Sequence, residues 1–406
     1  MSESKDKKNI NYNYEKICFC CGRPESSVPF LFHGNYGYIC SDCIEQGKKI
    51  LEEKASSINE NIMNDVPKPK EIKEFLDQYV IGQDRVKERV AVAVYNHYKR
   101  ISSPIVDDVE IEKNNIVLLG PTGSGKTLIA RTIARLLNVP FSIADATTLT
   151  QAGYVGDDVE SVLVSLYQAA DYDIEKTERG IVFIDEIDKI TRKTDNPSIT
   201  RDVSGEGVQQ ALLKLLEGSI VSIPPKGGRK HPEQPLVKIN TKNILFICGG
   251  AFVGIEKKIA QRCNQNVIGF NSDIHVNGKM EYDELMSHIN PLDLKAYGLI
   301  PEIIGRLPVI TYTSELDKDA LLRILKEPKN ALIKQYKRLF ELDNIKLEFT
   351  DEALEYIVDK TIEYKMGARG LRNTMENIMT KAMYEAPSMD ITELKVDLDY
   401  VKEKIG

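Results

Sequence analysis

Three short apolar runs mark the middle of the chain, at residues 116–119, 181–184 and 244–247. An uninterrupted apolar run of this length is typical of a strand that is buried on both faces of a sheet. Helical spacing follows the first run, where Ile129, Ile133, Leu136 and Leu137 fall on one face of a helix. Strands that alternate with helices predict an α/β domain with a mostly parallel sheet, helices on both of its faces, and ligands at the carboxyl ends of the strands.

The pattern differs on either side of this α/β region. Residues 51–66 are polar and rich in Ser and Asn, which predicts a linker. From residue 316 onward, helical spacing predicts a small, mainly helical domain with a short strand at residues 394–398. The expected helical positions are Ala320, Ile324, Leu332, Tyr336 and Leu339, followed by Leu371, Met375, Ile378 and Met379. A chain of 406 residues is in any case too long for one ordinary core.

A glycine-rich stretch, GPTGSGKT at residues 120–127, lies between the first apolar run and its helix. Backbone N–H groups of such a loop surround phosphate oxygens at a helix N-terminus, which already favours negative charge. Lys126 can reach the β- and γ-phosphates, and the Thr127 hydroxyl can bind Mg²⁺. Spacing and context together favour a nucleotide site over a turn without a ligand. We expect it to include Pro121, Thr122, Gly123, Ser124, Gly125, Lys126, Thr127 and Leu128.

The second apolar run ends in two carboxylates, Asp185 and Glu186. A carboxylate at the end of a strand beside the phosphate loop can hold Mg²⁺ through its waters, which is the role expected for Asp185. Glu186 is placed to orient and deprotonate the attacking water. Together with the phosphate loop, this pair predicts hydrolysis of a nucleoside triphosphate.

Five of the seven cysteines fall within the first 43 residues. Cys18 pairs with Cys21, and Cys40 with Cys43, as two Cys-x-x-Cys units whose separation suits a four-cysteine zinc site. Cys20 could compete as a ligand, although a Cys-x-Cys spacing closes such a site poorly. A redox dithiol pair is the alternative, and the matched spacing disfavours it. The apolar residues of this segment suit protein binding or self-association where they are exposed; they are Phe30, Leu31, Phe32, Tyr36, Tyr38 and Ile39.

Charge and composition narrow the class of partner. The formal net charge of −7 and the pI near 5.5 argue against a surface that neutralises nucleic-acid backbones. No apolar segment at the N-terminus predicts a secretory signal, and no apolar run approaches the length that spans a bilayer. We therefore expect a cytoplasmic protein without nucleic-acid or membrane partners.

Further motifs occur at residues 153–156 (GYVG), 229–231 (RKH), 268–270 (IGF), 304–308 (IGRLP) and 367–370 (GARG). With the cysteines, the phosphate loop and the Asp-Glu pair, they follow one another as in the ClpX family of AAA+ unfoldases. The chain resembles that family from Cys18 to about residue 387. The resemblance implies a disordered tail (1–12), a zinc-binding module (13–50), a linker (51–66), an AAA+ large α/β ATPase domain (67–315) and an AAA+ small α-helical domain (316–406).

The resemblance also implies an activity and partners. A homohexamer would use ATP, Mg²⁺ and Zn²⁺ to recognise, unfold and thread protein substrates through its pore into the ClpP peptidase, with adaptors helping to supply substrates. The implied pore residues are Tyr154, Val155, Arg201, Arg229, Lys230 and His231, and the implied ClpP-docking residues are Ile268, Gly269 and Phe270. Glycines beside Tyr154 suit a mobile loop whose aromatic ring grips a polypeptide.

Two arginines resemble the nucleotide sensors of the family. Arg306 would be the finger that reaches the γ-phosphate of the neighbouring subunit, and Arg369 would contact the nucleotide of its own chain. The resemblance places Val80 and Ile81 beside the adenine. Many AAA+ relatives carry Asn, Thr or Ser where Cys248 ends the third strand, and we assign Cys248 no catalytic role.

Two other functions are compatible with the same motifs. One is a remodelling chaperone that works without a peptidase, and the other is a nucleic-acid-dependent AAA+ motor, which the acidic balance disfavours. The chain shows no peptidase chemistry of its own, because Cys263 has no adjacent base or nucleophile turn. Any proteolysis is therefore expected to come from a partner.

Overall fold

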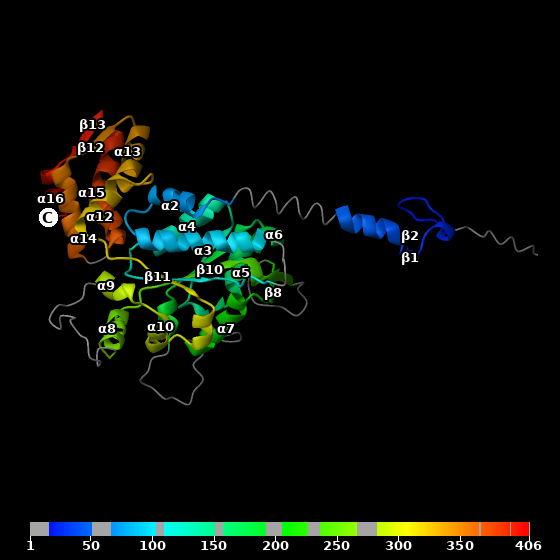
Figure 1. Ribbon diagram of the computed structural model, residues 1–406. Helices are drawn as coiled ribbons and strands as arrows, with labels where there is room; N and C mark the ends of the chain where they lie inside the picture. Colours follow the sequence, from blue (N-terminus) through cyan, green and yellow to red (C-terminus); the bar gives the residue numbers. More distant parts are fainter. Residues whose placement is uncertain are drawn as a thin grey trace, which may run out of the picture. The chain divides into compact units, whose positions relative to one another are not determined.

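The computed structural model describes residues 16–50, 66–102, 109–150, 157–191, 205–225, 236–265, 282–364, 367–389 and 391–405. The chain divides into two compact units (Figure 1). One consists mainly of the residues up to Val66, and the other mainly of the residues from Pro67 onward. The predicted tail at 1–12 and nearly all of the predicted linker at 51–66 lie outside the described residues.

The described part of the N-terminal unit, residues 16–50, has almost no hydrophobic core. It contains η1 (Glu25–Ser27), an antiparallel hairpin of β1 (Leu31–Gly34) and β2 (Gly37–Cys40), and a helical segment at residues 41–50. Only Cys18 and Cys40 are buried among residues 16–50. A segment this short cannot stabilise itself with so little buried apolar surface, so it needs a crosslink or a metal.

A five-stranded parallel sheet forms the centre of the large unit, in the order β11-β3-β10-β7-β4. Its strands are β3 (Ile116–Leu119), β4 (Phe141–Asp145), β7 (Ile181–Asp185), β10 (Leu245–Gly250) and β11 (Val309–Tyr312). The three predicted strands are its three inner strands, and the predicted parallel arrangement is confirmed. The two edge strands, β4 and β11, were not predicted.

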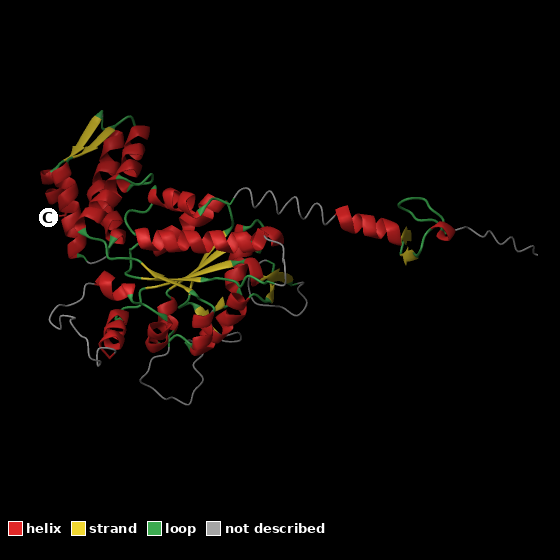
Figure 2. Cartoon of the chain, viewed as in Figure 1, coloured by secondary structure: helices red, strands yellow, loops and turns green. Residues whose placement is uncertain are grey.

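Helices cover both faces of this sheet, as predicted (Figure 2). On one face, alternate strand residues such as Val117, Leu119 and Val182 share a buried cluster with Leu212 and Leu216 of α7 (Glu206–Glu217). On the other face lie α3 (Asp84–Ser102) and α4 (Lys126–Leu137) (Figure 1). The inner strands are buried on both faces, which is why their sequences are continuously apolar.

Shorter elements complete the large domain. The helices are α2 (Pro69–Asp77), α5 (Ser161–Ala169), α6 (Ile174–Thr177), α8 (Ile255–Gln265), α9 (Tyr282–Ser287), α10 (Pro291–Tyr297) and α11 (Pro301–Gly305). The 3-10 turns are η2 (Ile187–Ile190) and η3 (Thr241–Asn243), and two small ladders pair β5 (Leu149–Thr150) with β6 (Asp157–Asp158) and β8 (Ile220–Ile223) with β9 (Val237–Asn240). Sequence signals fix some boundaries: Asn290 caps α10 in a capping box with Asp293, and Pro291 opens the helix.

A second core belongs to the C-terminal residues. Its helices are α12 (Lys318–Lys326), α13 (Leu332–Leu342), α14 (Asp351–Glu363), α15 (Ala368–Glu385) and α16 (Leu398–Ile405), with η4 (Ala386–Ser388) after α15. A parallel pair of β12 (Lys346–Phe349) and β13 (Glu393–Val396) lies beside them. The strand predicted at 394–398 is observed as β13, which begins one residue earlier than predicted and ends before α16 begins at residue 398.

The predicted helical positions of this region are confirmed, because they all lie in α12, α13 or α15, but only some of them face the core. Leu371, Met375, Ile378 and Met379 are fully buried, as predicted. In α12 and α13, however, the buried stripe is Leu321, Leu325, Ile333, Tyr336 and Phe340. Of the five positions predicted there, only Tyr336 is buried, and Leu339 is 49% exposed. At each of the other four positions, the next residue along the helix is also apolar, and it is this next residue that faces the core.

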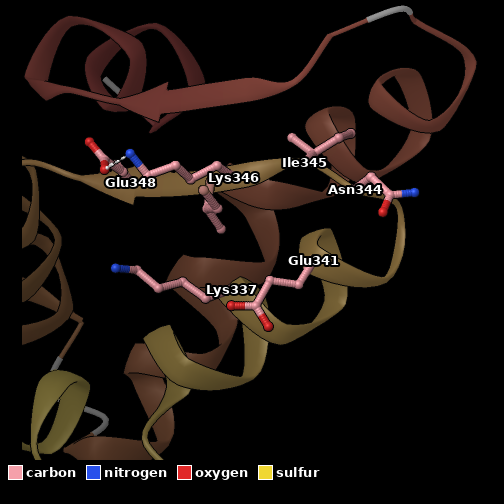
Figure 3. A pocket seen from close by; sticks show the side chains of 7 residues that line it. Lys337, Glu341, Asn344, Ile345, Lys346 and Glu348 are labelled. Carbon is pink, nitrogen blue, oxygen red and sulfur yellow. Dashed lines mark ion pairs between the residues drawn. The ribbon is translucent and has the colours of Figure 1, made fainter.

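A shallow hollow of about 340 Å³ lies between α13 and β12 (Figure 3). Both positively and negatively charged side chains line it, and Lys346 pairs with Glu348 at 2.6 Å. Lys337 and Glu341 extend from α13 toward the same hollow (Figure 3). Because these charges balance one another, the hollow shows no set of groups that converge on a ligand.

None of the described helices is both long enough and apolar enough to cross a membrane.

Candidate functional site

The phosphate loop joins the end of β3 to the start of α4. Gly120, Gly123 and Gly125 have φ angles of 137°, 82° and 101°, which residues with side chains rarely adopt. A Cβ at Gly120 would also overlap the hydroxyl of Thr313. The glycines therefore permit a tight loop that leads into the N-terminus of α4, where backbone N–H groups favour an anion.

Lys126, the first residue of α4, is buried and folds back over the loop. Its Nζ donates hydrogen bonds to the carbonyl oxygens of Gly120, at 2.7 Å, and Pro121, at 2.8 Å. Burial lowers the pKa of Lys126, while the negative charge of Asp185 acts in the opposite direction. A bound triphosphate would add negative charge beside this ammonium and so favour its charged form.

The acidic pair lies where β7 ends, directly beside α4. The Thr127 hydroxyl donates to Asp185 Oδ2 over 3.4 Å, so two oxygen groups of the kind that Mg²⁺ prefers face each other. Glu186 has a φ of 56°, in the left-handed region, and its N–H donates to Asp185 Oδ1 at 2.9 Å. Such backbone strain persists at functional sites where the surroundings impose it.

A pocket of about 660 Å³ connects these groups to the helical domain. Nine of the predicted residues line it: Thr122, Gly123, Gly125, Lys126, Thr127, Leu128, Asp185, Glu186 and Arg369. Lining residues that the motifs did not predict are Arg131, Asp188, Lys189, Ala251, Val253, Ala368 and Arg372. Most of these residues lie within three positions of a predicted one, whereas Ala251 and Val253 follow β10 and come from another part of the chain.

Arg369 reaches the pocket because the start of α15 lies directly against the phosphate loop. Gly367 has a φ of 57°, and a Cβ on it would be 2.9 Å from the carbonyl oxygen of Thr122. Only glycine fits both the backbone conformation and this spacing. Gly367 thus permits the helical domain to place Arg369 and Arg372 at the nucleotide pocket.

Val80 and Ile81, the predicted adenine contacts, do not line the pocket. They are buried, with 4% and 7% exposure, in the segment between α2 and α3. Lys87 is also buried, pairs with Asp77, and donates to the Val80 carbonyl at 3.0 Å. This ion pair holds the segment in place.

Arg306 lies away from its own chain's pocket, at the end of α11. Its guanidinium is half exposed and contacts Glu217, with Nε at 3.3 Å and Nη2 at 3.2 Å from the same carboxylate oxygen. Buried Asn115 donates to the Arg306 carbonyl at 2.8 Å and to the Leu216 carbonyl at 3.2 Å. Arg306 is therefore held at its backbone and at its side chain.

Four cysteine sulfurs gather in the N-terminal unit, and all lie within 4.8 Å of one another. They belong to Cys18, Cys21, Cys40 and Cys43, the predicted ligand set, while Cys20 is exposed outside the cluster. The Cys18–Cys43 and Cys21–Cys40 sulfur distances are 3.9 Å and 3.7 Å. A Zn–S length of about 2.3 Å implies tetrahedron edges of about 3.8 Å, so the cluster fits zinc.

The surroundings of two of these sulfurs, those of Cys18 and Cys21, favour thiolates, whereas the hydrogen bond with Cys21 raises the pKa of the Cys43 thiol. Backbone N–H groups, first that of Cys21, lower the pKa of the Cys18 thiol to about 6. Arg23 Nε lies 3.4 Å from Cys21 Sγ, and its hydrogen bond lowers the pKa of that thiol. Arg23 also pairs with Asp42 at 2.9 Å, which fixes its guanidinium beside the cluster. Sequence spacing identified the four ligands but not this arginine.

The predicted pore and docking residues lie outside the described residues. They are Tyr154, Val155, Arg201, Arg229, Lys230, His231, Ile268, Gly269 and Phe270. Pro121 and Ser124 of the phosphate loop are described, although neither lines the pocket. Ser124 is buried, and its hydroxyl lies 2.6 Å from that of Thr313.

The fold and the phosphate-loop pocket define an AAA ATPase. The profile of the AAA domain (Cdc48 subfamily) matches residues 111–310, and that of the C-terminal, D2-small domain of ClpB protein matches residues 316–395. The ClpX C4-type zinc finger profile matches residues 16–53. The whole chain is 58% identical to a Bacteroides fragilis relative over 97% of that relative, so it belongs to the ClpX family.

Other relatives agree. A Bacteroides thetaiotaomicron protein is also 58% identical, over all of this chain and 97% of its own length. A Porphyromonas gingivalis protein is 56% identical over 97% of each chain. All three relatives are named ATP-dependent Clp protease ATP-binding subunit ClpX.

Family and geometry together identify the cofactors as ATP, Mg²⁺ and Zn²⁺. The residues present fit all three groups. Lys126 and the start of α4 suit the phosphates, Thr127 and Asp185 suit the magnesium ion, and the four clustered sulfurs suit zinc. When bound, Mg²⁺ supplies positive charge that stabilises the transferred phosphoryl group.

Proposed function

We propose that the protein is an ATP-dependent unfoldase that assembles as a homohexamer and threads protein substrates through its pore into the ClpP peptidase. The observation that carries this proposal is the pocket in which Lys126, Asp185 and Glu186 of the α/β domain meet Arg369 of the helical domain. A nucleotide bound there contacts both domains, so its hydrolysis can change the angle between them. Identity to ClpX relatives over the whole chain supports the partners.

Each site residue has a proposed role. Lys126 and the loop residues 121–128 bind the phosphates, Thr127 and Asp185 hold Mg²⁺, and Glu186 accepts a proton from the attacking water. Val80 and Ile81 contact the adenine. Arg369 senses the nucleotide of its own chain, and Arg306 acts on the neighbouring chain's nucleotide, which requires a ring.

The remaining proposed roles fall on segments that contact other proteins. Pore contacts come from Tyr154, Val155, Arg201, Arg229, Lys230 and His231, and ClpP docking from Ile268, Gly269 and Phe270. Substrates are proteins with exposed terminal tags, supplied in some cases by adaptors. The zinc module exposes Phe30, Phe32 and Tyr36, which supports protein binding or self-association there.

Replacing Glu186 by glutamine is expected to lower kcat for ATP hydrolysis by about 10²–10⁴, because the amide cannot accept the proton of the attacking water. ATP binding should persist, since Lys126 and Asp185 remain. Phosphate release and equilibrium nucleotide binding measure the two quantities. The matched control is Glu175→Gln, an exposed glutamate of α6. Hydrolysis at the wild-type rate by Glu186→Gln would show that another group is the base.

The proposed function is tested with a stably folded fluorescent reporter that carries an unstructured C-terminal tag. With ATP and ClpP, the protein should abolish the fluorescence, and Tyr154→Ala should remove most of this activity while ATP hydrolysis continues. The remodelling chaperone would be favoured instead if the fluorescence is lost without the peptidase and the protein does not bind the peptidase. Stimulation of ATP hydrolysis by DNA, without any effect of unfolded protein, would favour the nucleic-acid motor.

A further inference from the structure

Three residues connect the two cores of the large unit. Tyr312, the last residue of β11, belongs to the core of the α/β domain, and Leu316 packs against the core of the helical domain. Thr313, Ser314 and Glu315 lie between them. Any change in the angle between the domains must therefore pass through this junction, which we define as residues 313–315.

Thr313 attaches the junction to the phosphate loop. It is fully buried, and its N–H donates to the Leu119 carbonyl at 2.8 Å. Its hydroxyl lies 2.6 Å from the Ser124 hydroxyl, inside the glycine-rich loop. A shift of the loop on binding phosphate would therefore reach the first residue of the junction directly.

Ser314 is attached to the segment between α2 and α3, which also contains Val80 and Ile81. The side-chain amide of Gln83 donates from Nε2 to the Ser314 carbonyl at 2.9 Å, and its Oε1 accepts from the Ser314 N–H at 2.8 Å. One side chain thus satisfies both backbone groups of a junction residue, in the way that a neighbouring strand would. This pair of bonds defines the relative position of the two segments more closely than a single bond could.

Gln83 itself is held in a strained backbone conformation. Its φ is 62°, directly after Gly82 at 61°, and a residue that is not glycine rarely adopts this left-handed conformation. The carbonyl of Gln83 accepts from the Lys87 N–H at 3.1 Å, and Lys87 Nζ holds the Val80 carbonyl. Such strain persists only where the surroundings impose the conformation. The segment 80–83 is therefore fixed at several points and is not a free loop.

We propose that Gln83 is a positioning residue that couples the segment at Val80 and Ile81 to the domain junction. A nucleotide would then act on the junction from two sides, through Thr313 at its phosphates and through Gln83 at its base. This inference rests on the proposed function, because it assumes that Val80 and Ile81 contact the adenine. It adds a residue that makes no contact with the nucleotide and transmits its presence by two hydrogen bonds.

The test compares Gln83→Ala, which removes both bonds, with Gln83→Glu, whose carboxylate keeps only the bond from the Ser314 N–H. The matched control is Gln335→Ala, because Gln335 also donates to a backbone carbonyl, that of Asn330 at 2.7 Å, but within the helical domain alone. A fluorescent donor and acceptor at positions 175 and 384, both exposed, report the approach of the two domains in the full chain.

Gln83→Ala is expected to shrink the change in energy transfer that ATP causes, and to lower unfolding events per ATP hydrolysed by roughly tenfold to thirtyfold. That range corresponds to two neutral hydrogen bonds of ordinary strength. ATP affinity should change less than this ratio, Gln83→Glu should lie between Gln83→Ala and the wild type, and Gln335→Ala should match the wild type. If Gln83→Ala does not fold, Gln83→Glu carries the same comparison.

A purely structural role predicts a different result. Gln83→Ala would then lower the melting temperature while the energy-transfer change and the unfolding per ATP stayed at wild-type values, and the proposal would be wrong. Failure of the proposed function is distinguishable, because the wild-type chain would then not unfold the reporter. The energy-transfer change would still report whether Gln83 couples nucleotide to the junction.

Discussion

Removal of zinc is expected to unfold residues 16–50 while the large unit remains folded. The apparent free energy of zinc binding in small structural sites is about 10–16 kcal/mol. The segment has no other comparable source of stability, because only two cysteines are buried in it. A chelator, or Cys40→Ser, should therefore abolish the protection of its backbone amides. Hydrogen exchange measured by mass spectrometry on the full chain reports this, alongside the zinc content.

Cys20 provides the matched control for this experiment. It lies in the same segment, is exposed, and stands outside the sulfur cluster. Cys20→Ser should keep one zinc ion per chain and normal amide protection. Loss of zinc from Cys20→Ser, or retained zinc and protection in Cys40→Ser, would contradict the ligand set.

Replacing Arg306 by alanine is expected to lower kcat for ATP hydrolysis by about 10³–10⁵, the range found for arginine fingers that act in trans. The physical reason is the loss of a guanidinium that stabilises negative charge on the transferred phosphoryl group. Arg338→Ala is the matched control, since Arg338 is also exposed and also pairs with a glutamate, Glu341 at 3.2 Å. Steady-state phosphate release measures both variants.

Mixed rings test whether Arg306 acts on a neighbour. Arg306→Ala subunits keep an intact Glu186, and Glu186→Gln subunits keep an intact Arg306. A mixture should regain hydrolysis that neither variant shows alone. In some pockets of a mixed ring, the Glu186 of one subunit then meets the Arg306 of its neighbour. If mixing restores nothing while rings still form, Arg306 does not act in trans. In the single chain Arg306 contacts Glu217, so it must leave that carboxylate to reach a neighbour's nucleotide.

The inner strands of the sheet could be predicted because burial on both faces makes their sequences uniformly apolar. The edge strands β4 and β11 could not, since β4 mixes buried with exposed residues and the mostly buried β11 contains a polar residue, Thr311, that interrupts its apolar run. The helical periodicity of the apolar residues also did not determine which face of α12 is buried. Ala320 and Leu321 are adjacent, as are Ile324 and Leu325, so helical spacing fits either pair, and the structure buries the leucines.

The placement of the site residues was predictable where a short motif carries them, as in the phosphate loop, the Asp185–Glu186 pair and the four cysteines. Contacts between a side chain and a distant backbone leave no such pattern. Gln83 and Ser314 are far apart in the chain, and nothing in either local sequence indicates their two hydrogen bonds. The same holds for Asn115 and the Arg306 carbonyl.

The strand order of the sheet has a consequence for synthesis on the ribosome. The strand that carries the phosphate loop, β3, pairs only with β10 and β11, and both are encoded far downstream of it. Pairings between distant segments form slowly, and they cannot form at all before the later segment exists. The nascent chain therefore exposes an unpaired, wholly apolar β3 until β10 emerges. Its nucleotide site is expected to become competent only after residue 313 has left the exit tunnel.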